Sequence, residues 1–205
     1  MAAVTFQDER AHEDKIDKQL VAAYQRGNSH ALSELYRRHS RRVESVARHV
    51  IGPSSELEDV VQDVFVELQR ALYKFRGDSR FTTWLHRVTV NVALQHIRKG
   101  KRKGWLRWVG LDAAPSLQPV THMDKHIEAR ETVKALYEVL DTISEKKRVV
   151  FALYELEGMS LQDIAATVGT SVNTVKSRLF HARKEIFGEI KRRGLLPTHT
   201  LQVIK

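Results

Sequence analysis

The sequence lacks several features that mark whole classes of protein. Its 205 residues include no cysteine, which excludes disulfide bonds, thiolate metal sites and a cysteine nucleophile. No stretch approaches the ~20 apolar residues of a membrane span, and the polar N-terminus lacks the apolar core of an export signal. The ten histidines never form the HExxH spacing of a metal enzyme. We therefore expect a cytoplasmic protein without membrane insertion, metal or cofactor.

Acidic residues are also outnumbered in this chain. There are 34 Lys and Arg residues against 25 Asp and Glu residues, which gives a net charge of +9. Such an excess favours an anionic partner, either nucleic acid or a membrane surface, without deciding between them. The length allows one domain or two small ones.

Helical spacing of apolar residues dominates the chain, so we expect an all-α fold. The pattern predicts a mobile leader over 1–13 and a four-helix domain over 14–103. A flexible linker over 104–126 follows, with no periodic pattern. A second small helical domain over 127–193 and a tail over 194–205 complete the chain.

The stretch from Ser55 to Phe75 is predicted to be an amphipathic helix in the first domain, with Ser55 and Glu58 as a capping box. Its other face is acidic, although the protein is basic. One interpretation is a solvated face whose acids complement the helix N-terminus. The alternative is a docking face for a partner. The acids are Glu56, Glu58, Asp59, Asp63 and Glu67, with Gln62 among them.

A basic helix is predicted from about Thr82 to Lys99. Its outward face carries Arg87, Asn91, Gln95 and Arg98 at helical spacing. A solvated helix end would explain the last cations, because cations are favoured at a helix C-terminus. Contact with phosphates explains the whole face, because Arg87 and Asn91 extend it away from that end.

The second domain contains the pattern of a helix-turn-helix. A short helix from Leu161 to Val168, with Ser160 and Asp163 at its start, is followed by a turn at Gly169 and a long helix from Val172. The exposed side of the long helix combines cations with short polar groups, as a DNA-recognition helix does. These residues are Asn173, Thr174, Lys176, Ser177, Arg178, His181, Arg183 and Lys184.

Three motifs stand in one order: DVVQDVF, FRGDSRFTTWLHRVTVN and GMSLQDIAATVGTSVNTVKSRLFHAR. In sequence and spacing the chain resembles bacterial sigma factors of the extracytoplasmic-function (ECF) group, over about 20–103 and 136–190. The resemblance implies a factor that binds core RNA polymerase, directs it to promoters and aids duplex opening, and that catalyses no reaction itself.

The resemblance also implies partners and roles for residues. Asp59, Gln62 and Asp63 would contact the clamp helices of the largest polymerase subunit, and the second domain would contact the flap of the second-largest subunit. An anti-sigma factor is a further expected partner. The minus-ten element would be read by Phe75, Arg76, Gly77, Asp78, Ser79, Arg80, Arg87, Asn91 and Arg98.

The minus-thirty-five element would be read by the long helix of the second domain. Lys176 and His181 stand where relatives often have Arg, and Lys cannot form the bidentate fork that Arg makes to guanine. The promoter sequence is therefore left open. The residues implied are Asn173, Thr174, Lys176, Ser177, Arg178, Phe180, His181 and Arg183.

Two other functions are compatible with parts of the sequence. A helix-turn-helix repressor or activator would explain the second domain, but it would leave the first domain without a task. A nucleic-acid enzyme would need a convergent acid/base or metal cluster, and the sequence contains no such pattern.

Overall fold

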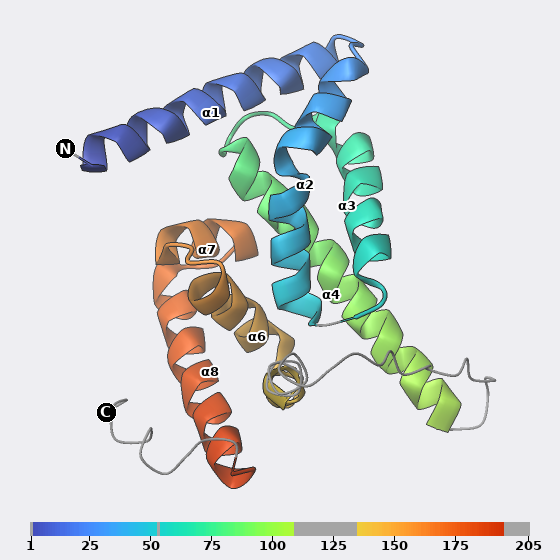
Figure 1. Cartoon of the computed structure of the whole chain (residues 1–205), viewed down its shortest axis with the longest axis vertical. Coiled ribbons are helices and arrows are strands. Elements are labelled where there is room, and N and C mark those ends of the chain that lie inside the picture. The colour runs from blue at the N-terminus through green and yellow to red at the C-terminus, as the bar shows by residue number, and fades with distance from the viewer. Residues whose placement is uncertain (1, 53, 109–134, 195–205) are drawn as a thin grey trace, which may run out of the picture.

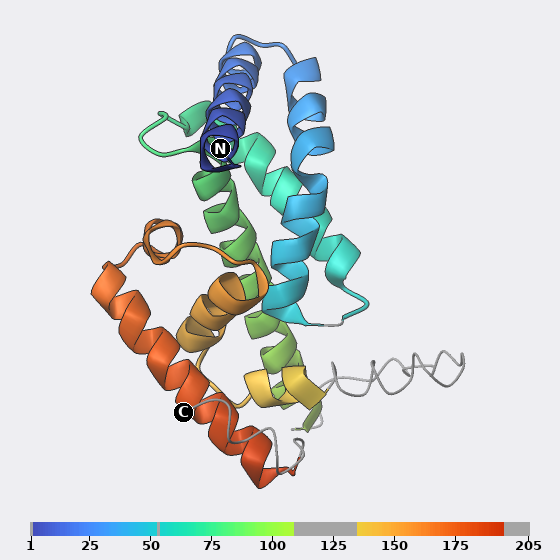
Figure 2. The ribbon, with the colours of Figure 1, turned by 60° about the vertical axis from the view of Figure 1, so that its left-hand side comes forward.

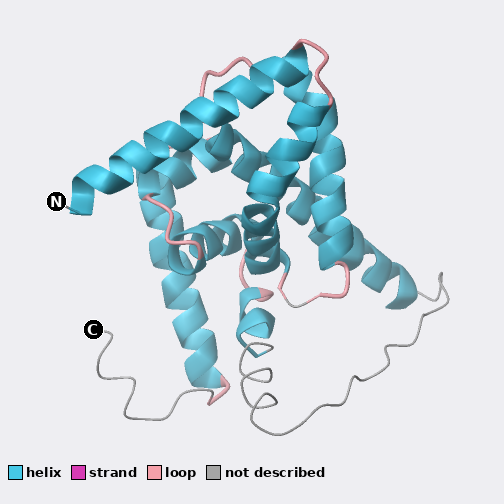
Figure 3. Cartoon of the chain, turned by 45° about the horizontal axis from the view of Figure 1, so that its top comes forward, coloured by secondary structure: helices cyan, strands magenta, loops and turns pink. Residues whose placement is uncertain are grey.

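The computed structural model describes residues 2–52, 54–108 and 135–194. Within these ranges every regular element is a helix (Figure 3), which confirms the predicted all-α class. The first domain consists of α1 (Ala2–Gln25), α2 (His30–Ile51), α3 (Leu57–Ala71), the 3-10 turn η1 (Leu72–Lys74) and α4 (Phe81–Trp108). No described helix is both long enough and apolar enough to cross a membrane.

Helix α2 is the centre of the first domain, in contact with α1, α3 and α4. Its apolar stripe places Leu35, Val46 and Val50 in the core, where they are fully buried. Leu68 of α3 and Leu85 of α4 are buried against it. Each helix thus covers its apolar face with a neighbour, as the helical spacing predicts.

Three boundaries differ from the sequence prediction. The leader predicted over 1–13 is helical from residue 2, and α4 continues through the first residues of the predicted linker to Trp108. Helix α3 begins at Leu57, and Glu56 at its N-cap makes no side-chain cap. The predicted capping box of Ser55 and Glu58 is therefore wrong. Ser54 takes the role of a local acceptor, since its Oγ accepts from the Glu56 N–H at 3.1 Å.

The second domain begins, in the described part, with a helical stretch over 135–140. It continues with α6 (Glu145–Phe151), the π-helical turn η2 (Ala152–Leu156), α7 (Leu161–Val168) and α8 (Val172–Arg192). The helix-turn-helix prediction is confirmed at its caps. Ser160 Oγ accepts from the Asp163 N–H at 3.1 Å, and Ser171 Oγ accepts from the Thr174 N–H at 3.2 Å.

Part of the second domain's core is continuous with that of the first domain, and a separate buried cluster lies within the second domain. Figures 1 and 2 show the second domain against one side of α4. Helix α7 contacts α4, and η2 contacts α2. Val149, Leu153 and Ile164 of the second domain belong to the same buried cluster as Val46 and Leu85 of the first. The sequence predicted two domains joined only by a linker, most of which lies outside the described residues.

Candidate functional site

The three residues predicted to bind polymerase lie on an uncovered ridge of α3. Asp59, Gln62 and Asp63 are all exposed. On one side of the ridge, α2 and α3 form a groove of about 460 Å³. The rings of Tyr36 and Phe65 pack against each other in it, tilted, with centroids 4.3 Å apart, and Tyr36 remains 49% exposed. Its lining residues are Leu32, Ser33, Tyr36, Gln62, Phe65, Val66 and Gln69.

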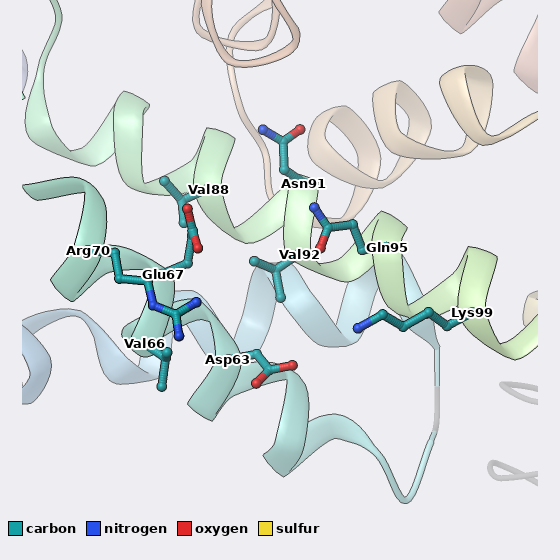
Figure 4. Close-up of a pocket in the computed structure, with 9 residues that line it drawn as sticks. All are labelled: Asp63, Val66, Glu67, Arg70, Val88, Asn91, Val92, Gln95 and Lys99. Atoms are coloured by element: carbon teal, nitrogen blue, oxygen red, sulfur yellow. The ribbon is translucent and has the colours of Figure 1, made fainter. Parts of the chain in front are cut away.

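The other side of the ridge faces a groove of about 420 Å³ between α3 and α4 (Figure 4). Asp63 is held there by His96, whose Nε2 lies 2.9 Å from its Oδ2. Figure 4 shows the Lys99 side chain reaching toward Asp63, and Asn91 pointing outward from α4 at the rim. Asp59 and Gln62 are therefore freer for a partner than Asp63, which is already engaged.

The loop predicted to read the minus-ten element joins η1 to α4. Arg76, Gly77, Asp78 and Ser79 are exposed. Phe75 is partly buried, because its ring lies 5.0 Å from that of Trp84 and 6.1 Å from that of Phe81.

Asn91 is far from this loop along α4. It follows Phe81 by ten residues, a distance of about 15 Å along a helix. The structure thus places Asn91 at the rim of the groove between α3 and α4, while Phe75 packs on the first turn of α4. Phe75 and Asn91 are not brought into one pocket.

The predicted promoter face of α4 is partly covered by the second domain. The Arg87 guanidinium lies against the helix-turn-helix turn, so close that a Cβ added to Gly169 would fall 2.7 Å from Nη2 of Arg87. Arg98 donates from Nε to Oε2 of Glu145 at 2.8 Å. Arg98 is thus engaged by Glu145, whereas Arg87 lies beside the turn but is exposed.

A polar cleft of about 380 Å³ lies between the first turns of α4 and the second domain. It is lined by cations and acids of both domains, including Arg42, Arg80 and Asp163. His86 lies in this cleft. Burial, followed by the charge of Arg42, lowers the pKa of His86 from 6.5 to about 4, so the ring is neutral at pH 7.

Further contacts between the domains involve residues that the sequence analysis does not single out. Oε1 of Glu157 accepts from Ser45 Oγ at 2.8 Å and also contacts Nδ1 of His49. The ring of Tyr137 covers Gly52, where an added Cβ would fall 2.8 Å from its Cδ1. Partners this distant in sequence leave no local pattern by which they could have been found.

The recognition helix α8 presents most of its predicted DNA-reading residues to solvent. Lys176, Ser177 and His181 are exposed, and Phe180 is 65% exposed. Asn173 is exposed as well, whereas Arg178 and Thr174 are half-buried.

Two of these residues take part in the fold itself. Thr174 belongs to the α8 cap, since its Oγ1 lies 2.9 Å from Ser171 Oγ. Arg183 donates from Nε to Oε1 of Glu155 at 2.6 Å, and its guanidinium lies 5.4 Å from the Tyr154 ring centre. Arg183 is therefore less available to DNA than Lys176.

Comparison with known families places both domains. Residues 35–103 match the model of sigma-70 region 2, and residues 134–186 match that of sigma-70 region 4. The chain belongs to the sigma-70 family. Among curated relatives, the ECF RNA polymerase sigma-E factor of Escherichia coli K12 is 32% identical over 87% of this chain and 96% of its own length. The RNA polymerase sigma-H factor of Pseudomonas aeruginosa PAO1 is 31% identical, over 83% of this chain and 91% of its own.

Solved structures resemble most of the chain. CnrH, solved in complex with the cytosolic domain of CnrY, superposes with a TM-score of 0.63 at 26% identity, over 86% of this chain and 98% of CnrH. The sigma factor RpoE, solved with the anti-sigma factor NepR from Bartonella quintana, gives a TM-score of 0.56 at 20% identity, over 78% and 96%. The latter likeness supports the fold alone.

Proposed function

We propose that this sigma factor is a subunit of RNA polymerase holoenzyme during initiation: it binds the core enzyme, directs it to specific promoters and assists duplex opening. It acts in the cytoplasm and has no catalytic activity of its own. The relatives named as RNA polymerase sigma factors, which match across both domains, support this role over that of a free helix-turn-helix regulator.

The observation that carries the proposal is the uncovered ridge of α3. Gln62 lines an apolar groove together with the half-exposed Tyr36, and Asp59 is exposed one turn earlier on α3. Acids beside an apolar groove suit a partner helix with cations along one side of an apolar stripe. We assign this ridge to the clamp helices of the largest subunit, and the second domain to the flap of the second-largest subunit.

The promoter contacts follow from the two basic helices. We assign the minus-ten element to α4 and the loop before it, and the minus-thirty-five element to α8. The two elements lie roughly two turns of duplex apart, about 70 Å. Arg87 touches the α7–α8 turn in the present arrangement. The two domains must therefore separate before both elements can be bound together, and the chain over 109–134 is long enough to allow this.

The proposal is tested by reconstitution. Purified core polymerase is mixed with the full-length protein, and promoters are selected from random DNA by the assembled holoenzyme. We expect co-purification with core and specific transcripts from the selected DNA. Nanomolar, sequence-selective binding to DNA by the free protein at physiological salt would favour the free regulator instead, since two small separate reading heads bind weakly alone.

An anti-sigma factor is a proposed second partner. CnrH was solved with the cytosolic domain of CnrY bound, and it is similar to 86% of this chain. A protein that stabilises the packed arrangement of the two domains would hold Arg87 against the α7–α8 turn and Arg98 on Glu145. Such an inhibitor should compete with core polymerase for the purified protein, and simultaneous binding of both would contradict this role.

A further inference from the structure

Helix α1 holds both ends of the loop over 75–80. Gln25 at its C-terminal end donates from Nε2 to the carbonyl oxygen of Leu72 at 3.0 Å and to that of Phe75 at 2.9 Å. Eleven residues earlier on α1, Oδ2 of Asp14 lies 2.7 Å from Nε of Arg80. Figure 1 shows the loop between η1 and α4 passing beneath α1. One helix therefore binds the residue at which the loop starts and the residue at which it ends.

The hydrogen bonds of Gln25 meet a specific need of the backbone. The chain leaves η1 in an extended conformation at Phe75, and the Leu72 carbonyl, which accepts from the Phe75 N–H at 3.1 Å, keeps a second lone pair. A side chain with two N–H groups can satisfy two such carbonyls at once. Gln25 thereby fixes the direction in which the loop departs, while Phe75 is fixed on Trp84.

Helix α1 is itself anchored firmly enough to serve as a support. Asp17 is fully buried, with Nε of Arg38 at 3.2 Å and Nε2 of His39 at 3.0 Å. Val21 and Tyr24 of α1 are buried in the core of the first domain. A buried carboxylate held by two partners of α2 allows little sliding of α1 along its neighbour.

We propose that α1 is the positioning element of the promoter-reading loop, with Gln25 and Asp14 as its positioning residues. They fix the loop ends so that the exposed centre, Arg76–Ser79, is presented to an unstacked base of the non-template strand. The inference rests on the proposed function. It goes beyond it because neither Gln25 nor Asp14 is among the residues assigned to promoter contact, and both lie before the segment matched by the region 2 model.

The physical reason is preorganisation. Unstacking a base costs free energy, which is recovered only if the receiving groups already stand in place. A loop with free ends would have to be ordered at the moment of capture. Loss of the two Gln25 hydrogen bonds should therefore slow promoter opening without changing the surface that binds polymerase.

The test uses Gln25→Glu in the full-length protein. Glutamate keeps the size of the side chain and removes its donors, so it cannot bind the two carbonyls. Gln19→Glu, the same change at an exposed position of α1, is the matched control. We expect holoenzyme with Gln25→Glu to form about tenfold less open complex than wild type, because two hydrogen bonds are lost. The amount of open complex is measured by the permanganate reactivity of unpaired thymines. Core affinity and the unfolding midpoint should match those of Gln19→Glu.

A second template separates positioning from other roles. On promoter DNA already mismatched over the minus-ten element, the melting step is bypassed, and Gln25→Glu should regain most of its activity. If Gln25→Glu opened duplex promoters as well as Gln19→Glu does, or if it lost core binding in proportion to opening, the inference would be overturned. If the wild type bound no core and opened no promoter, the proposed function would fail instead.

Asp14→Asn provides a second test of the inference if Gln25→Glu folds poorly. This variant removes the ion pair at the other end of the loop and leaves the Gln25 hydrogen bonds in place. We expect the same pattern with a smaller loss, since ion pairs near the surface are weak. Normal opening by a folded Asp14→Asn, alongside a Gln25→Glu that melts early, would mean that α1 only stabilises the fold.

Discussion

Arg98 of α4 and Glu145 of α6 form an ion pair that joins the predicted minus-ten face to the second domain, with Nε 2.8 Å from Oε2. The pair is partly exposed, with 63% of the Arg98 side chain accessible. Such pairs contribute little, about 0–1 kcal/mol. Most of the free energy that holds the domains together must therefore come from elsewhere in the interface.

Glu157 is the polar contact whose loss should matter most. Its side chain is only 14% exposed and serves Ser45 and His49 together. Glu157→Ala should weaken domain packing by about 1–3 kcal/mol, because it leaves half-buried polar groups unpaired. Small-angle scattering or energy transfer between dyes on the two domains should show a more open protein. Glu138 is paired within the second domain, so Glu138→Ala should leave the distance between the two domains unchanged.

Gly52→Ala should destabilise the protein for two separable reasons. Gly52 has φ of +89°, and its Cβ would fall 2.8 Å from Cδ1 of Tyr137. The backbone strain costs about 1–3 kcal/mol, and the clash adds to it. In a double-mutant cycle measured by urea unfolding, Tyr137→Ala should relieve the clash but leave the strain. Equal cost of Gly52→Ala in both backgrounds would show that Tyr137 does not pack there.

His86 should make stability depend on pH. Its pKa in the folded protein is lowered to about 4 from 6.5, so the unfolded chain binds the extra proton more readily. The contribution of neutral His86 is therefore complete above pH 6.5 and is lost as the pH falls from 6.5 toward 4. The stability difference between wild type and His86→Gln should change across that window. A constant difference from pH 7.5 to 4.5 would contradict the buried, neutral ring.

If the exposed ridge of α3 binds core polymerase, substitutions on it should weaken that binding and leave the protein folded. Asp59→Ala with Gln62→Ala should leave helical circular dichroism and the thermal midpoint nearly unchanged, because both side chains are exposed. Core binding should weaken by about 2 kcal/mol or more if they lie at the centre of an interface. Glu34→Ala on α2 is the control. A double mutant that still binds core would mean that the acidic ridge is only solvated.

The recognition helix should divide into base and phosphate contacts. Lys176→Ala should relax preference at one promoter position and cost about 1–3 kcal/mol. Arg178→Ala should weaken binding to all sequences and lower the salt slope by about one unit. If Lys176→Ala and Arg178→Ala lowered promoter affinity equally for all sequences, the assignment of Lys176 to a base and Arg178 to a phosphate would be wrong.

Arg183 should behave differently from either, although the sequence predicts that it contacts DNA. Because it is paired with Glu155 and lies over Tyr154, Arg183→Ala should lower the unfolding midpoint more than the other two substitutions do. An unchanged midpoint with reduced promoter binding would restore it to the DNA contacts.

Local signals predicted the second domain well. Ser160, the helical spacing after it and Gly169 all act within a few residues, and α7, the turn and α8 formed where they indicated. The start of α3 was predicted two residues too early, because Ser54 and Ser55 are equally good acceptors by composition. Among the described contacts, only the Ser54 hydroxyl binds the Glu56 N–H.

Long-range contacts could not be predicted from these patterns. Glu157 and His49 are 108 residues apart, and each looks locally like a surface residue. Gln25 likewise reaches Leu72 across 47 residues. The residues of the candidate interfaces were identified by family motifs, but whether each is free or engaged depends on such partners. This is why Arg98 and Arg183 differ from Lys176 in the structure.

The buried Asp17 has a practical consequence for anyone who divides this chain into fragments. The region 2 match begins at residue 35, and a fragment cut there would contain Arg38 and His39 without the carboxylate that binds both. It would also expose the apolar surface that Val21 and Tyr24 cover. Such a fragment should be prone to aggregation, whereas one that begins before Asp14 should fold. The folding unit is longer than the segment by which the family is recognised.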